Sequence, residues 1–135
     1  MPRLHVVAVR ARLPDWAEAA CADYARRMPR GYEVGRVNVK GEERLRSAIP
    51  KGARLVALDE RGRDLTTAQF AALLKLDTAF VIGGPDGLDA GIKEGASLLL
   101  RLSSLTLPHA LAQVILLEQI YRAATLLIGH PYHRE

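Results

Sequence analysis

The stretch LSSLTLPHALAQVILLEQIYRAATLLIGHPYHRE, residues 102–135, decides how this chain can fold. It begins with a loop of small hydroxyl residues and leucines, and Pro108 then leads into a helix that is apolar on most of its circumference. The last six residues hold two histidines, a tyrosine, an arginine and a glutamate. Chain ends usually fray, so a tail this rich in titratable groups indicates a function. A helix this apolar needs cover, and its C-terminal end predicts a homodimer interface.

Upstream of this stretch, apolar and β-branched runs alternate with helical patterns. The runs predict five strands, at residues 4–10, 32–39, 54–59, 79–82 and 98–102. The glycine in the second run suggests an edge strand. Strands that alternate with helices are typical of an α/β domain, so we expect a mainly parallel sheet of five to six strands flanked by helices. The length of 135 residues fits one domain spanning residues 1–135.

Three helix boundaries can be predicted from local signals. Asp15 is expected to cap the first helix, and Trp16, Ala20, Tyr24 and Met28 are expected to form its core-facing stripe. Thr66 and Gln69 have the spacing of a capping box. Gly129 suits the position just after the end of the long helix.

Composition narrows the functional classes. A net charge of +4 and a pI near 9.6 suit a polyanionic partner without identifying one. The single cysteine, Cys21, excludes an internal disulfide and fits a reducing cytosol. No signal peptide is expected at the start of the chain. The longest apolar region, residues 110–128, contains Glu118 and Arg122 and is a poor membrane span. The i, i+4 spacing of Glu118 and Arg122 favours an ion pair on the helix. We therefore expect a cytoplasmic protein.

Ligands of parallel sheets bind at the carboxyl ends of the strands, here after Leu58, Ile82 and Leu102. The second loop, residues 83–87 (GGPDG), lets backbone approach a ligand closely, but it lacks the Gly-Lys-Ser/Thr of a Walker loop. No GxGxxG follows the first strand. The third loop, residues 102–107, could read an adenine and a ribose, or Ser104 or Thr106 could simply cap the next helix.

Four segments resemble one known family: residues 82–88 (IGGPDGL), 102–109 (LSSLTLPH), 117–123 (LEQIYRA) and 130–135 (HPYHRE). The family is the bacterial 23S ribosomal RNA methyltransferase that modifies N3 of a pseudouridine, within the SPOUT class. The resemblance implies a C-terminal trefoil knot, S-adenosylmethionine as methyl donor, a homodimer, and the assembled ribosome as substrate. It also implies the donor-binding residues Leu58, Gly83, Gly84, Leu102, Ser103, Ser104, Leu105, Thr106 and Leu107.

The sulfonium methyl is already activated, so the reaction needs position and a deprotonated N3 rather than a metal. The predicted catalytic residues are His109, Tyr132, His133, Arg134 and Glu135. We expect the tail to close over the site, with Tyr132 and His133 nearest the base and Arg134 positioning the RNA. Which residue takes the proton stays open.

Two alternatives remain from the residues themselves. One is a sister knotted methyltransferase that acts on transfer RNA. The other is a dimeric binding module for an adenine-containing ligand or RNA, which would not need the polar tail. One segment departs from the family pattern, since residues 40–51 are shorter and less lysine-rich than expected. This shortening affects how RNA is gripped rather than the donor site.

Overall fold

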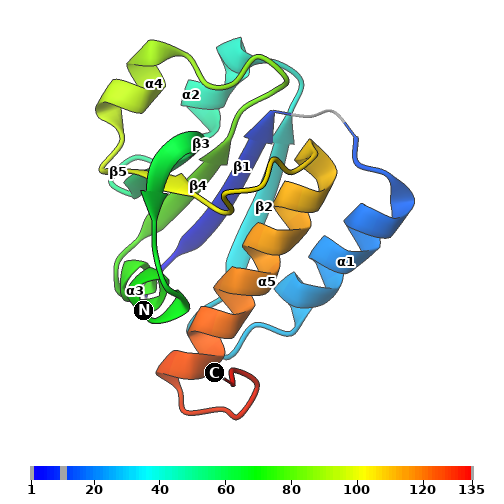
Figure 1. Ribbon diagram of the computed structural model, residues 1–135, viewed down its shortest axis with the longest axis vertical. Coiled ribbons are helices and arrows are strands. Elements are labelled where there is room, and N and C mark those ends of the chain that lie inside the picture. The colour runs from blue at the N-terminus through cyan, green and yellow to red at the C-terminus, as the bar shows by residue number, and fades with distance from the viewer. Residues whose placement is uncertain (1, 10–11, 135) are drawn as a thin grey trace.

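The five predicted strands lie side by side in one sheet, and every pairing between them is parallel (Figure 1). A computed structural model describes residues 2–9 and 12–134. The strands are β1 (Leu4–Val9), β2 (Val34–Val39), β3 (Arg54–Asp64), β4 (Thr78–Ile82) and β5 (Leu98–Arg101). Their order is β2-β1-β4-β3-β5, with β2 at one edge as predicted. The α/β class and the parallel sheet are confirmed.

Helices cover both faces of the sheet, as the alternation of side chains along the strands requires. On one face, Val6, Phe80 and their neighbours pack against α1 (Asp15–Arg26), α3 (Thr67–Ala71) and α5 (His109–Leu127). On the other face, Val7 and Val81 pack against the shorter helices α2 (Leu45–Ala48) and α4 (Ala90–Gly95). Two 3-10 turns, η1 (Glu42–Arg44) and η2 (Ala72–Lys75), precede α2 and follow α3. Every residue of β4 is buried.

The start of α1 differs from the prediction. Trp16 is 57% exposed, and Ala17 and Cys21 are fully buried instead, so the first half of the predicted stripe is wrong. Tyr24 and Met28 pack in the core as predicted. Small side chains face inward there, where α1 packs closely against α5. Asp15 is the first helical residue and not the cap, which is Pro14, whose carbonyl oxygen accepts from the N–H groups of Ala17 and Glu18. The Asp15 carboxylate still complements the helix dipole.

Strand β3 continues five residues past its predicted end at Asp59. Its pairing with β5 shifts register between Leu58 and Arg63, so the intervening residues bulge out of the ladder. Gly62 passes so close to β5 that an added Cβ would lie 2.7 Å from backbone atoms of Leu99 and Leu100. The bulge brings charged residues to the carboxyl end of the sheet.

The long helix α5 is largely covered within one chain. Among its buried residues are Leu116, Leu117 and Ile120, together with the polar Gln113 and Thr125. By length and composition α5 is also long and apolar enough to cross a membrane, but it packs against α1, α3 and the sheet as a core helix does. The last turn and the residue after it leave Leu126 and Ile128 exposed.

The other two predicted helix boundaries form as expected. Thr66 and Gln69 exchange the two hydrogen bonds of a capping box, at 3.1 and 2.9 Å. Gly129 has φ +77° after the end of α5, where glycine is favoured. The N–H of His130 donates to the Thr125 carbonyl at 2.9 Å, and that of Gly129 donates to Leu126 at 3.2 Å. This Schellman motif turns the chain back along α5 and directs the tail.

Candidate active site

A cavity of about 550 Å³ lies at the carboxyl ends of β3, β4 and β5, beside the start of α5. Eight of the nine predicted donor-binding residues line it: Leu58, Gly83, Gly84, Leu102, Ser103, Leu105, Thr106 and Leu107. Ser104 is exposed and is not part of the lining. The volume falls in the range of small-molecule sites. The strand order therefore brings together three loops that the sequence alone separates by many residues.

The glycine loop after β4 folds back on itself. A Cβ added at Gly83 would lie 2.7 Å from the carbonyl carbon of Gly87, so no larger residue fits there. The Gly87 N–H donates to the Gly84 carbonyl at 2.9 Å, and Gly87 has φ +77°. Glycine is needed at Gly83 for close approach and at Gly87 for its left-handed backbone. The turn forms one wall of the cavity.

The loop after β5 forms the opposite wall. The Ser103 hydroxyl accepts the Leu105 N–H at 2.9 Å, and the Leu105 side chain is 75% exposed. The cap of α5 is Pro108, with no side-chain cap hydrogen bond, so the alternative of Ser104 or Thr106 as the helix cap is wrong. Thr106 lines the cavity instead.

The β3 bulge supplies charged groups to the rim, which the sequence analysis did not assign to the site. Asp59 accepts the Arg61 N–H at 2.8 Å and pairs with Lys93 Nζ at 2.9 Å. The Arg61 N–H and the Lys93 ammonium both hold the pKa of Asp59 below its usual value. The rest of the predicted loop 83–87 also lines the cavity, and the lining residues that the sequence did not indicate are Glu60, Arg61, Ile82, Leu88, Leu100, Arg101 and Ala112. The rim thus suits a ligand that carries charges of both signs.

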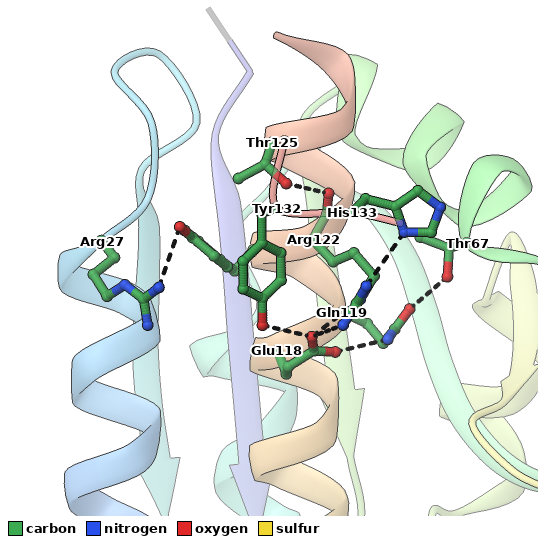
Figure 2. A network of polar contacts seen from close by, with 9 residues as sticks. Arg27, Thr67, Glu118, Gln119, Arg122, Thr125, Tyr132 and His133 are labelled. Carbon is green, nitrogen blue, oxygen red and sulfur yellow. Dashed lines mark hydrogen bonds and ion pairs between the residues drawn. The ribbon is translucent and has the colours of Figure 1, made fainter. Parts of the chain in front are cut away.

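The tail folds back against the middle of α5, where a network of polar contacts holds it (Figure 2). The Tyr132 hydroxyl donates to Glu118 Oε2 at 2.9 Å. Arg122 donates to the same oxygen at 2.7 and 3.0 Å, which confirms the predicted ion pair, and its Nη1 lies 3.3 Å from His133 Nδ1. Gln119 donates to the other Glu118 oxygen at 2.7 Å and accepts from Thr67 of α3. Glu118 is therefore the centre of the network.

Aromatic contacts fix the Tyr132 ring. It meets the Tyr121 ring nearly at right angles, with centroids 4.7 Å apart, and the Arg122 guanidinium lies 4.9 Å from its centroid. Burial, then hydrogen bonding with Tyr24 and Glu118, raises the pKa of Tyr132 well above its ordinary 10.0. At neutral pH this phenol stays protonated, so it can donate a hydrogen bond but is a poor general base.

Residues 2–133 match the family model described as "Predicted SPOUT methyltransferase". The chain belongs to this family. The protein named Ribosomal RNA large subunit methyltransferase H from Paracidovorax citrulli is 49% identical, over 98% of this chain and 99% of that protein. The protein of the same name from Polynucleobacter asymbioticus is 47% identical with the same coverage. The predicted family resemblance is confirmed.

A solved SPOUT-class structure supports the fold. The SpoU methyltransferase AviRb from Streptomyces viridochromogenes, in complex with the cofactor AdoMet, superposes with a TM-score of 0.57 at 16% identity. It matches 93% of this chain, which spans 58% of its length. Alignments with the curated relatives run over as many as 154 positions, more than the 135 residues of this chain. The relatives therefore contain insertions relative to this chain.

In this SPOUT chain the predicted catalytic residues lie in two places. His109 is half-buried, begins α5 and lines the cavity. Tyr132 and His133 contact Glu118 and Arg122 instead, and Glu118 lies nine residues after His109, about 14 Å along the helix axis. Arg134 is exposed, and Glu135 lies outside the described residues. Within one chain the described tail residues and the cavity are not brought together.

Proposed function

We propose that this protein transfers a methyl group from S-adenosylmethionine to N3 of a pseudouridine in 23S ribosomal RNA, on the assembled ribosome in the cytoplasm. The observation that carries the proposal is 49% identity, along 98% of this chain and 99% of its relative, to a protein named Ribosomal RNA large subunit methyltransferase H. The pseudouridine and the assembled ribosome rest on the sequence resemblance of the glycine loop and the HPYHRE tail.

The cavity fits the methyl donor. Its walls are leucines and loop backbone, which suit a flat adenine, and its rim carries the Asp59–Lys93 pair, which suits an amino-acid group with both charges. When bound, S-adenosylmethionine supplies an activated methyl group. The residues assigned to hold it are the eight predicted ones that line the cavity, and Ser104 is not among them. The chemistry then depends on position and on deprotonation of N3.

The knot of the SPOUT class belongs to this proposal. The two loops that would form it, residues 83–87 and 102–107, line opposite walls of one cavity, and α5 leaves directly from the second. In a trefoil knot the C-terminal end of the chain passes through a loop, which would fix α5 against the loops of residues 83–87 and 102–107. This arrangement would couple the donor site to the helix that carries the catalytic network.

We also propose that the site is completed in a homodimer, in which the tail of one chain closes over the cavity of its partner. The separation of tail and cavity in one chain supports this arrangement, and exposed Leu126 and Ile128 supply apolar surface for a partner. A two-fold dimer would build two equivalent sites. Each site would use the loops of one copy and residues 132–135 of the other.

The roles in this composite site follow from charge and protonation. Tyr132 is a neutral phenol whose single O–H proton would turn from Glu118 to the charge developing on the base when the RNA is bound. Arg122 keeps Tyr132 and His133 in place through Glu118 and its own guanidinium. Arg134 is exposed and is assigned to contact the RNA backbone. The acceptor of the N3 proton is then one of His109, His133 and Glu135.

The test offers labelled S-adenosylmethionine to whole ribosomes, free large subunits and bulk transfer RNA in parallel. We expect label in 23S ribosomal RNA of whole ribosomes, at N3 of a pseudouridine. Label only on transfer RNA would replace the proposal with the sister activity. Donor binding without label on any RNA would favour the binding module.

A further inference from the structure

The C-terminal end of α1 carries three arginines within five residues, Arg26, Arg27 and Arg30. Arg26 and Arg27 share a single carboxylate, that of Asp23, and Arg27 is 3.3 Å from it. Side-chain exposure is 72% for Arg26 and 44% for Arg27, and Arg30 is exposed. One carboxylate cannot neutralise three guanidinium groups, so this surface keeps an excess of positive charge.

The position of Arg27 is fixed by aromatic rings rather than by charge alone. Its guanidinium carbon lies 4.7 Å from the Tyr121 centroid and 5.7 Å from the Tyr24 centroid. Its Nη2 donates to the Tyr121 hydroxyl at 3.4 Å (Figure 2). A cation that packing holds in one place loses little conformational entropy when it binds an anion. Arg27 is therefore preorganised while remaining half-exposed.

This surface is joined directly to the catalytic tail. Tyr121 contacts both Arg27 and Tyr132. Its ring centroid lies 4.7 Å from the guanidinium carbon of Arg27 and 4.7 Å from the ring centroid of Tyr132. An RNA strand that delivers a base to Tyr132 must place its neighbouring phosphates within reach of the end of α1. The nearby Glu33 carboxylate accepts the Gly31 N–H and is engaged locally.

Helix-dipole compensation accounts for only part of the pattern. It favours cations in the last helical turn, which ends at Arg26, and its effect falls off within that turn. Arg30 lies beyond the helix, and the stacking of Arg27 on two rings has no role in such compensation. Exposed, preordered arginines beside aromatic side chains are typical of surfaces that bind single-stranded RNA.

We propose that Arg26, Arg27 and Arg30 form an RNA-binding surface that contacts phosphates of the nucleotides flanking the methylated base. The inference rests on the proposed function and extends it to the residues that grip the substrate. Arginine suits this role because its planar fork binds phosphate oxygens in pairs.

The test compares initial methylation rates over a range of ribosome and salt concentrations for wild type, Arg26→Gln/Arg30→Gln and Arg27→Gln. The matched control is Lys51→Gln/Lys75→Gln, which removes the same charge as the double variant from exposed positions elsewhere. We expect the double variant to have a KM for ribosomes about tenfold higher than wild type. The slope of log kcat/KM against log salt concentration should become shallower by about two, one for each lost phosphate contact. Arg27→Gln should raise KM about fivefold. Donor affinity and melting temperature should stay at wild-type values in the double variant.

An unchanged KM and salt slope in both arginine variants, with active wild type, would overturn the surface and leave the methyltransferase intact. Equal losses in the lysine control would also overturn it, because the effect would then be one of general charge. If wild type itself methylates no ribosomal RNA, the proposed function fails and the surface proposal falls with it.

Discussion

The two ends of the α5 region differ in the chemical groups that they present. The cavity end is made of leucines and loop backbone, with one tight glycine turn and a charged rim. The tail end is a network of side chains in which Glu118, Arg122, Tyr132 and His133 fix one another. Backbone and apolar walls suit binding of a donor, whereas positioned titratable groups suit chemistry on a base. One helix joins the two ends and keeps them apart within a chain, so the proposed dimer is the arrangement that would unite them.

Removal of the tail should separate the two ends most sharply. Truncation after Pro131 deletes Tyr132 to Glu135, and we expect kcat to fall at least about 100-fold because transition-state contacts are lost. Donor affinity should stay within about twofold of wild type, because no described tail residue lines the cavity. Single-turnover methylation and calorimetric donor binding measure the two quantities. Loss of donor binding on truncation would show that the ends are not separate.

A change at Gly83 should have the reverse effect. Gly83→Val would press a side chain into the Gly87 backbone, 2.7 Å from the added Cβ, and distort the cavity wall. We expect donor affinity to fall more than about tenfold and stability to fall by roughly 2 kcal/mol. Gly95→Ala is the control, since its added Cβ meets nothing within 4 Å. Equal donor affinity in both variants would show that the glycine turn does not contribute to donor binding.

Tyr132→Phe tests the tail network without deleting it. The ring contacts remain but the hydroxyl bond to Glu118 is lost, so we expect kcat to fall about tenfold. Because the folded-state pKa of Tyr132 is raised above 10.0, its stabilising contribution is complete below pH 10 and is lost as pH rises through the folded-state value. Tyrosinate absorbance should show one late ionisation, which the variant lacks. An unchanged titration curve would contradict the buried phenol.

The smallest effect is expected at the cavity rim. Asp59→Asn removes a carboxylate that the Arg61 N–H and Lys93 stabilise, and we expect donor affinity to fall about threefold. The lowered pKa of Asp59 means that its contribution to stability is present above the unfolded-state pKa and is lost as pH falls through the folded-state value. Urea denaturation should show a larger difference in stability between wild type and variant at pH 7 than at pH 3. A pH-independent difference would assign the effect to packing.

Features that depend on residues close together in the sequence, such as helix caps and ion pairs within a helix, could be predicted from the sequence. The capping box at Thr66, the glycine at 129 and the Glu118–Arg122 spacing all form as expected. The error at Trp16 arose where close packing of α1 against α5 favoured the small side chains of Ala17 and Cys21, and the error at Asp15 is a helix start one residue earlier than predicted.

The features that the sequence could not predict depend on distant contacts. The extension of β3 exists because β5 pairs with it on both sides of a bulge, and that bulge brings Asp59 to the cavity. The eight correct cavity residues came from the family resemblance together with the rule for parallel strands. The fold-back of the tail onto Glu118 could not be foreseen, because it depends on the Schellman turn and on the Tyr121 ring together.

Subunit mixing tests most directly whether the two ends meet across a dimer. The chain truncated after Pro131 retains its cavity, and Gly83→Val retains its tail, so each homodimer should be inactive. After mixing, unfolding and refolding at equal concentrations, half of the dimers should be mixed, and each should hold one complete site. We predict recovery of about a quarter of wild-type methylation activity. If the mixture stays as inactive as its two components, the tail of one chain does not serve the cavity of the other.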